Sequence, residues 1–579
     1  MVKHQPLPQI YEKQLCLSFL TGIYGCRWKR YQRSHDDSSK WERAWFSILC
    51  GTFFLLLFWV YFWLEAHNDY NQFNWLIYNR SGVWKDDTIA IFAATAVGLS
   101  YITFLMILAL CHISLGQQMK LYWIHKVCLL ATLLTTVSGM VYVEDVWGDE
   151  WDIILVSMQH TGPFLHICAL VAATLLGWLV AGHVVRGQRT KFQMTLLLIY
   201  VGVLLALYLA PLFMSSPCVM DRNGLKPRPD VIGRRGAPML APENTIMSFN
   251  KALQQGVSSL EADVTVSLDG VPFLMRDRTL RRTTDIATVY PDRQYQDASL
   301  FNWTEIRSLN AGQWFLKSDP YWTGGSLTWR DRNVIANLTV CSLVEMLRLA
   351  ARANRSALLN LHRPPPEHPH HKTWIMNAMW AVQRSGIPQK RVTWTPDTDR
   401  ARVRGLQQTS SEKRSVEELR SRGISSVTLR YSQTGNEDIR YYLADNVSVT
   451  VYPVNEPWLY SVLWCSGVPS VSSDAPQVLR TVLQPIWLLS PYEYGLLWIT
   501  SDFVSIVVVI GMFIFQKWKM SGMQHYNPEQ IMLSAVTRRP GPNVNVMKEK
   551  LIFSEVRNGV TSIDEHLHPE NGYDIGQYK

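Results

Sequence analysis

The sequence predicts a multi-pass α-helical membrane protein with six spans that carries an α/β barrel outside the membrane. Three observations support this fold class. Six apolar runs have the length of membrane-spanning helices, and most basic residues outside the segment 215–490 gather at one set of ends of these runs. The long segment between the fifth and sixth runs alternates strand-like and helix-like patterns.

The composition excludes several classes of protein. The chain has 579 residues, of which 47% are hydrophobic and 18% are charged. Soluble domains usually carry roughly 25% charged residues, and disordered chains have few apolar residues. The net charge of +9 would suit a nucleic-acid-binding protein only if the basic residues formed one folded patch. They lie mostly beside apolar runs, so we expect a lipid bilayer as partner and no nucleic acid.

The apolar runs divide the chain into segments. Each run is about 20 residues long or longer, which is enough for a helix to cross a hydrocarbon core roughly 30 Å thick. Five runs fall in the first part of the chain, and one falls near its end. The expected segments are a cytosolic N-terminal segment at 1–43, five transmembrane helices in 44–214, an outer domain at 215–490, a sixth transmembrane helix at 491–516 and a flexible cytosolic tail at 517–579.

Loop charges predict the orientation of the spans. Arg27, Lys29 and Arg30 precede the first span, Lys517 and Lys519 follow the last, and the opposite loops are acidic. Because cytosolic loops carry the excess of Lys and Arg, we expect cytosolic termini and an extracellular or luminal domain, in the plasma membrane or an endomembrane. Sequons that predict N-linked glycosylation lie only on the expected outer side, at Asn79, Asn302, Asn337, Asn354 and Asn446.

The outer segment alternates short β-rich runs with amphipathic stretches such as Ser342–Ala353 and Thr373–Ser385. This alternation predicts a parallel sheet, and about eight strands close most simply into a TIM barrel with functional residues at the carboxyl ends of the strands. The candidate strands are Asp230–Ile232, Leu260–Thr265, Pro272–Met275, Ala357–Leu361, Arg391–Trp394, Ser426–Leu429, Ser448–Tyr452 and Ser470–Ser473.

Charged residues follow the first candidate strands. Arg234 and Arg235 follow the first strand, Glu261 and Asp263 end the second, and Arg276 follows the third. Because alternate residues of a strand face the same side, both carboxylates can point into the barrel mouth. Two oxygen ligands with this spacing suit calcium or magnesium, although the E-x-D pattern is also frequent on surface strands. Glu243 and Asn244 are expected to be loop and helix-capping residues.

Residues 230–475 resemble the glycerophosphodiester phosphodiesterase family, in its branch with six membrane spans. The resemblance rests on G-x-R-G-A-P…A-P-E-N-T, E-A-D-V-T-V-S-L-D-G-V-P-F-L-M, R-T-T and V-N-E-P…G-V-P-S-V-S-S-D. It implies a TIM-barrel hydrolase of lipid metabolism that splits glycerophosphodiesters into glycerol phosphate and an alcohol. In the membrane branch it implies binding of glycosylphosphatidylinositol head groups, release of surface proteins held by that anchor, surface-protein partners and a role in cell differentiation.

The resemblance also implies a mechanism and its residues. The substrate's glycerol hydroxyl attacks the phosphorus, two histidines exchange protons, a divalent cation neutralises the phosphate and an arginine holds it. Arg234 and Arg276 stand at the two catalytic histidine positions. The metal positions are Glu261, Asp263 and Asn360, where Asn360 replaces a carboxylate. Arg235 and His362, which replaces a lysine, are the expected phosphate-binding residues.

The two arginines predict impaired turnover. Histidine exchanges protons near neutral pH, whereas arginine stays protonated. Arg234 and Arg276 are expected to form ion pairs with Glu261 and Asp263, and metal binding can be lost as a result. His362 is the best candidate for rescue. The loop that holds His368, His370 and His371 is expected to be solvated.

Several functional alternatives remain open from the sequence. One is a weakened phosphodiesterase, and another is a catalytically inactive phosphate-binding receptor or scaffold that acts in cell differentiation. A third is a structural cluster of ion pairs without a ligand. Among the outer cysteines, Cys218, Cys341 and Cys465, one pair can form a disulfide, and the sequence does not choose it.

Overall fold

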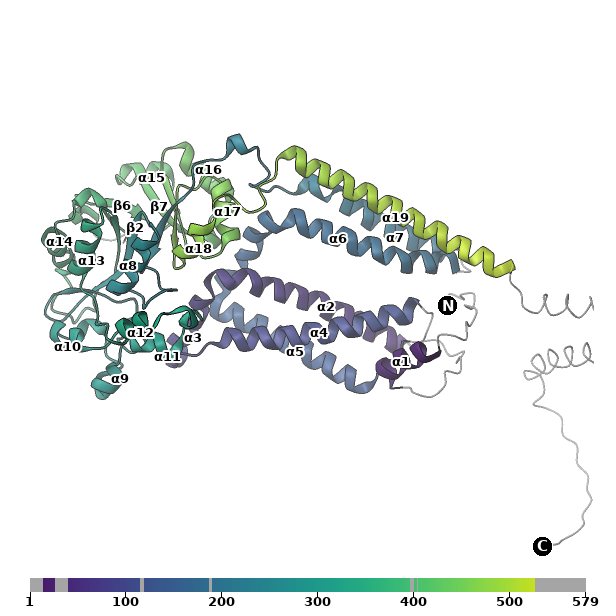
Figure 1. Cartoon of the computed structure of the whole chain (residues 1–579), viewed down its shortest axis with the longest axis horizontal. Coiled ribbons are helices and arrows are strands. Elements are labelled where there is room, and N and C mark those ends of the chain that lie inside the picture. The colour runs from purple at the N-terminus through teal and green to yellow at the C-terminus, as the bar shows by residue number, and fades with distance from the viewer. Residues whose placement is uncertain are drawn as a thin grey trace, which may run out of the picture.

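The computed structural model describes residues 14–26, 40–114, 119–186, 190–395, 400–403 and 405–525. In these residues a bundle of long helices is joined at one end to a barrel (Figure 1). Helix α1 (Gln14–Gly25) lies at the other end of the bundle. Most of the predicted tail at 517–579, and much of the predicted segment 1–43, lie outside the described residues.

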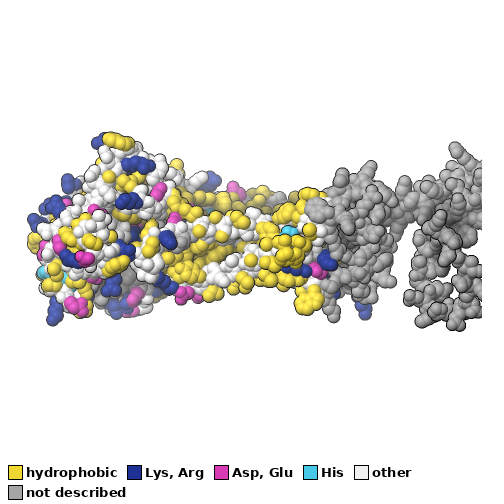
Figure 2. Space-filling model, turned by 90° about the horizontal axis from the view of Figure 1, so that it is seen from below, with side chains coloured by type: hydrophobic (Ala, Val, Ile, Leu, Met, Phe, Trp, Pro, Cys, Tyr) yellow, Lys and Arg dark blue, Asp and Glu magenta, His cyan; other side chains and the backbone are white. Residues whose placement is uncertain are grey.

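Six long helices in the described part of the chain coincide with the apolar runs. Five stretches are long and apolar enough to cross a membrane, and the third, Trp123–Val185, contains two of these helices. Apolar side chains cover much of the bundle surface, whereas charged side chains are frequent on the barrel (Figure 2). These features indicate a membrane protein, while the number and direction of crossings stay predictions. The helices are α2 (Lys40–Ala66), α4 (Asp87–Ser114), α5 (Trp123–Trp147), α6 (Ile153–Arg186), α7 (Thr190–Leu209) and α19 (Pro491–His525).

The outer segment forms a closed barrel of parallel strands. The hydrogen-bonded order runs from β1 through β2, β4, β5, β6, β7, β8 and β9, and β9 pairs with β1 to close the barrel. Closure leaves no barrel edge unpaired and brings all strand carboxyl ends to one mouth. The strands are β1 (Asp230–Arg234), β2 (Ser259–Val266), β4 (Ser356–Leu361), β5 (Val392–Trp394), β6 (Gln407–Ser410), β7 (Ser426–Arg430), β8 (Ser448–Tyr452) and β9 (Ser470–Ser473).

The predicted number of barrel strands is correct, but one predicted member is wrong. Strand β3 (Pro272–Leu274) pairs antiparallel with β2 and stays outside the ring. A tight turn with Gly270 at φ +85° connects the two strands. The missed member is β6, whose sequence QQTS has no apolar residue. Its Thr409 is nevertheless buried and exchanges a 2.9 Å hydrogen bond with Thr428 of β7.

Helices cover the outside of the barrel, and the two predicted amphipathic stretches are confirmed as α13 (Leu343–Arg352) and α14 (Trp374–Ser385). Ser342 and Glu345 form a capping box at the start of α13, and its buried residues recur on one face. The other helices of the outer segment are α8 (Ile246–Gln254), α9 (Ile286–Val289), α10 (Trp303–Ser308), α11 (Gln313–Ser318), α12 (Trp329–Ala336), α15 (Val416–Ser421), α16 (Asn436–Ala444), α17 (Pro457–Cys465) and α18 (Pro476–Thr481).

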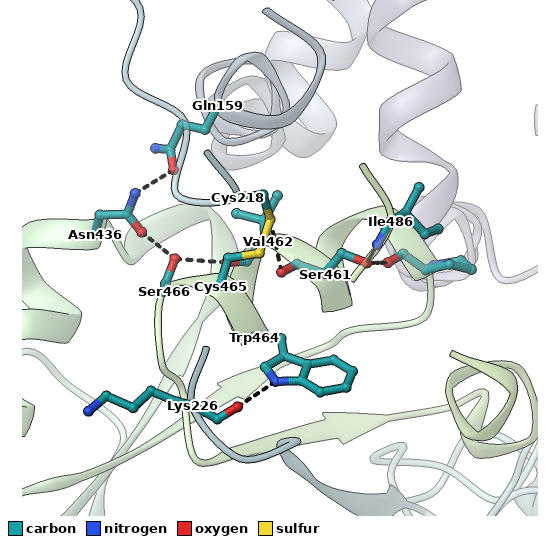
Figure 3. Close-up of a disulfide and its surroundings, with 11 residues drawn as sticks. Gln159, Cys218, Lys226, Asn436, Ser461, Val462, Trp464, Cys465, Ser466 and Ile486 are labelled. Atoms are coloured by element: carbon teal, nitrogen blue, oxygen red, sulfur yellow. Dashed lines mark hydrogen bonds between the residues drawn. A yellow bond between two sulfur atoms is a disulfide. The ribbon is translucent and has the colours of Figure 1, made fainter. Parts of the chain in front are cut away.

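A disulfide joins Cys218, which follows α7, to Cys465 at the end of α17 (Figure 3). The third outer cysteine, Cys341, is buried with a free thiol. Beside the disulfide, the side chain of Asn436 donates a 3.0 Å hydrogen bond to Gln159 of α6. The disulfide therefore fastens the barrel where the chain leaves the bundle.

The bundle and the barrel share one apolar core. Trp63 and Phe73 of the bundle belong to the same cluster of buried side chains as Leu429 and Val451 of the barrel. Helix α3 (Tyr70–Ser81) and the short helix η2 (His67–Asp69) connect α2 to α4 at this junction. The loop between α2 and α4 is thereby placed against the barrel mouth.

Candidate functional site

The barrel brings the predicted site residues together at its mouth. Arg234 pairs in register with Glu261, and Asp263 pairs with Asn360 on the neighbouring strand. The backbone N–H of Met275 donates to the backbone carbonyl of Asp263 at 2.9 Å, so the end of β3 lies beside Asp263. The sequence therefore predicts correctly which strand ends meet.

Arg234 and Arg235 share one carboxylate. Nη1 of Arg234 lies 3.0 Å from Oδ2 of Asp474, and Nη2 of Arg235 lies 3.0 Å from its Oδ1. Burial favours loss of the guanidinium proton, but the combined effect of Asp474, Glu261 and Asp69 is larger and raises the pKa of Arg234. Both guanidinium groups are therefore fixed cations at the end of β1.

A second group of ion pairs continues this network. Arg235 also contacts Glu243 at 3.0 Å, and Arg282 contacts Glu243 at 2.5 Å and Asp277 at 2.6 Å. Burial would raise the pKa of Glu243, but Arg282 and Arg235 hold it well below its usual range. Glu243 lies in the loop before α8, as expected, and it forms buried ion pairs there. Thr245 caps α8 instead.

The expected ion pairs of Arg234 and Arg276 with Glu261 and Asp263 do not form. Glu261 accepts a hydrogen bond from the hydroxyl of Ser472, and burial raises its pKa. Neither arginine lies within 4.0 Å of these carboxylates, because Asp474 holds Arg234 while Arg276 turns toward α3. The prediction missed Asp474 because it lies far away in the sequence.

Asp263 is held by amide groups. Nδ2 of Asn360 donates to its Oδ1 at 3.0 Å, and Nδ2 of Asn244 donates to its Oδ2 at 3.3 Å. Nε2 of the half-exposed His362 lies 4.0 Å from Oδ1. Burial would raise the pKa of Asp263, but Arg235 and His362 lower it. The carboxylate is therefore ionised inside a positive environment.

Arg276 has no carboxylate partner within ion-pair distance among the residues the structure describes. Its Nη2 donates to Oε1 of Gln72 at 2.5 Å, and its Cζ lies 4.4 Å from the ring centre of Trp75. Burial, together with Arg235 and Arg234, lowers the pKa of Arg276 to about 10. The guanidinium is still protonated at neutral pH, so it is a partly buried cation with spare hydrogen-bond donors.

A small pocket adjoins this cation. Glu243, Asn244, Met275, Arg276 and Thr283 contribute to its lining. Arg282 and Arg235 neutralise Glu243, so Arg276 supplies the unpaired charge at the pocket wall. A guanidinium in such a place suits an anion such as phosphate.

The residues present do not fit a tightly held divalent cation. Glu261 and Asp263 already accept hydrogen bonds, and Asn360 directs its amide N–H group at Asp263. No group of three His, Cys, Asp or Glu side chains that could hold a metal ion occurs within residues 14–525 where the structure describes them. Nearby guanidinium groups further oppose a second positive charge.

The other candidate histidines hold the loop that follows β4. His368 is buried, and its Nε2 lies 3.0 Å from the carbonyl oxygen of Ser299. Nδ1 of His371 lies 2.7 Å from the carbonyl oxygen of Pro364. The expectation of a fully solvated loop is therefore wrong for His368.

Residues 235–477 match the glycerophosphoryl diester phosphodiesterase family. "Glycerophosphodiester phosphodiesterase domain-containing protein 5" of Gallus gallus is 55% identical over 99% of this chain and 97% of its own length. "Glycerophosphoinositol inositolphosphodiesterase GDPD2" of Homo sapiens is 39% identical over 86% of this chain and 92% of its own length. A solved Oleispira antarctica phosphodiesterase in complex with the product sn-glycerol-3-phosphate is 22% identical, with a TM-score of 0.36, over 44% of this chain and 96% of its own.

Proposed function

The chain belongs to the glycerophosphodiester phosphodiesterase family, and from this membership we propose a membrane-anchored phosphodiesterase-like protein that binds the phosphate of glycerophosphodiesters but hydrolyses them poorly. The observation that carries the proposal is the pair of arginines at the positions expected for the catalytic histidines, Arg234 and Arg276. Both lie at the barrel mouth, and neither can exchange a proton at neutral pH.

Both arginines are almost fully protonated at neutral pH. With a pKa of about 10, only roughly one Arg276 side chain in a thousand is neutral at pH 7. Arg234 is bound to Asp474, which raises its pKa further. General acid–base catalysis supplies roughly 10²–10⁴-fold in rate, so the loss of both groups should reduce turnover by at least that order.

Binding of the phosphate group needs no proton transfer. Arg276 presents a partly buried cation, and Arg235 and Arg234 add to the positive potential. Charged hydrogen bonds to phosphate are stronger than neutral ones, and a guanidinium can make two of them at once. His362 stands at the rim as a further candidate contact.

Members of the family generally depend on a divalent metal. In this chain Glu261, Asp263 and Asn360 would be the ligands, and calcium or magnesium would be the cation. The amide contacts of Asp263 and the neighbouring guanidinium groups oppose its binding. We infer that metal affinity is weakened, which lowers turnover further.

We further propose that the barrel faces the cell exterior or an organelle lumen and that both termini are cytosolic. All five sequon asparagines are exposed, which glycosylation requires. Glycosylphosphatidylinositol head groups are the membrane-borne ligands that fit this placement. A receptor or scaffold role in cell differentiation is the alternative, and it is favoured by the extensive ion pairing at the site.

A hydrolysis assay on the full chain tests the proposal. With glycerophosphocholine and calcium or magnesium, the natural chain should release choline no faster than a metal-stripped control. The double substitution Arg234→His with Arg276→His should raise the rate by roughly 10² or more, because it supplies proton-exchanging groups. Rapid hydrolysis by the natural chain would refute the proposal. No gain in the double variant would show that the two histidine positions are assigned wrongly.

A further inference from the structure

We propose that helix α3, in the first outer loop of the bundle, completes the phosphate site, with Gln72 and Trp75 as positioning residues for Arg276. The inference rests on the proposed function, because it concerns the same site. It adds the claim that the anion site is built from two parts of the chain, the barrel and the membrane bundle.

The start of α3 is fastened to the barrel mouth by Asn68. Its Nδ2 donates to the carbonyl of Pro453 at 3.0 Å, and its Oδ1 accepts from the backbone N–H of Asn455 at 2.8 Å. Nδ2 of Asn455 donates in turn to the carbonyl of Asn68 at 2.7 Å. These groups are buried, so breaking the contacts would leave polar atoms unpaired. The neighbouring Asp69 forms a 3.0 Å ion pair with Arg430.

Two further contacts tie α3 to the loops of the barrel. Tyr70 donates a 3.2 Å hydrogen bond to the carbonyl of Pro320, and its ring stacks on that of Trp322 at 5.1 Å. Gly82, which ends α3 with φ +70°, accepts a 2.6 Å hydrogen bond from Nη1 of Arg281. A helix held at both ends can position another side chain precisely.

Gln72 and Trp75 lie three residues apart and therefore on one face of α3. Gln72 accepts a hydrogen bond from Arg276, and the ring of Trp75 lies under its guanidinium. Nε1 of Trp75 donates at 2.8 Å to Asp277, which Arg282 also binds. The Trp75 ring is thus a fixed platform against which Arg276 rests.

The chemistry of these two partners keeps Arg276 available to an anion. An amide oxygen and an aromatic face orient a guanidinium without cancelling its charge, whereas a carboxylate would do both. Gln72 uses one of the five N–H donors of Arg276. The remaining charge and donors suit an anion such as phosphate at the barrel mouth.

Replacing Gln72 by glutamate tests whether Gln72 positions Arg276 for phosphate or only packs against it. The Gln72→Glu change keeps the size of the side chain but adds a carboxylate that competes with phosphate for Arg276. Thermal unfolding should therefore occur at the same or a higher temperature, while affinity for phosphate falls. If Gln72 had only a structural role, the substitution would not lower the affinity for phosphate while keeping or raising the unfolding temperature.

The experiment uses the full chain in lipid nanodiscs, with inorganic phosphate and sn-glycerol 3-phosphate as titrants in calorimetry. Charged hydrogen bonds contribute about 1.5–3 kcal/mol, so Gln72→Glu and Trp75→Ala should each weaken binding roughly 10- to 100-fold. Trp75→Phe keeps an aromatic face and should recover most of the affinity. Gln407→Glu, at the opposite end of the barrel, makes the same charge change and should bind like the natural chain.

The outcomes distinguish the two proposals. Equal affinities for Gln72→Glu, Gln407→Glu and the natural chain would overturn the role of α3 but leave phosphate binding intact. Equal affinities for Trp75→Ala and Trp75→Phe would overturn the platform role of Trp75. Failure of the natural chain to bind either titrant would overturn the proposed function and this inference together.

Discussion

The carboxyl ends of β1 and β3 present the same residue type in opposite environments. Arg234, the last residue of β1, shares the carboxylate of Asp474 with Arg235. Arg276, after β3, rests on Trp75 and bonds to the neutral Gln72. The β1 arginine is therefore committed to the fold, whereas the β3 arginine retains a charge for a ligand. The arginine at the first expected histidine position therefore stabilises the fold, whereas the arginine at the second remains available to bind a ligand.

The largest expected difference between the two strand ends is in stability, and replacement of Asp474 should reveal it. The change Asp474→Ala leaves Arg234 and Arg235 as buried cations and should lower the free energy of unfolding by about 3–5 kcal/mol. Arg276→Ala removes no ion pair and should cost much less. Chemical denaturation of both variants measures the difference, and equal losses would show that the two strand ends do not differ as described.

Ligand affinity should show the reverse order. Arg276→Gln removes the unpaired cation and should weaken binding of sn-glycerol 3-phosphate roughly 10- to 100-fold, as expected for a lost charged hydrogen bond. Arg234→Gln should weaken it less, because Asp474 offsets the charge of Arg234. Calorimetry on both variants tests this order, and a larger loss for Arg234→Gln would reverse the assignment.

The pH dependence of binding sharpens the difference between arginine and histidine at position 276. With a pKa of about 10, Arg276 stays charged from pH 6 to 8, so Arg276 itself should contribute no change in affinity for glycerophosphocholine over this range. In Arg276→His, the imidazole is charged only below its pKa of about 6.5, so affinity should fall as pH rises through that value. Titration at several pH values measures both curves. A fall in the natural chain between pH 6 and 8 would indicate another titrating group.

The smallest expected effect is that of a divalent metal. Because Asp263 is held by Asn244 and Asn360 beside several guanidinium groups, calcium or magnesium should not measurably raise the affinity for glycerophosphocholine. Calorimetry with and without a chelator tests this expectation. A clear gain with metal would show that Glu261 and Asp263 hold the cation despite these contacts.

The sequence predicts those parts of the fold that depend on local pattern. The amphipathic face of α13 follows from residue spacing alone. Strand β6 escapes because its residues are polar and its position is set by pairing with its neighbours. Strand β3 is wrongly predicted to be a member of the barrel. A buried apolar run does not reveal whether it pairs parallel or antiparallel with its neighbour.

The site is predicted in its residues but not in its partners. Arg234 ends β1, Glu261 and Asp263 lie on the neighbouring β2, and Arg276 follows β3, which pairs with β2, so strand pairing brings these residues to the mouth. Asp474 comes from a much later part of the chain, and Gln72 and Trp75 come from a loop expected only to connect two spans. A local sequence pattern does not reveal contacts between residues that lie so far apart in the chain.

One phosphorus NMR experiment tests the central claim most directly, because it reports binding and hydrolysis in the same sample. Glycerophosphocholine is mixed with the full chain in nanodiscs at neutral pH with calcium. The account predicts a broadened or shifted diester signal and no growing signal of glycerol phosphate over the background. Steady growth of the glycerol phosphate signal, absent when metal is removed, would contradict it.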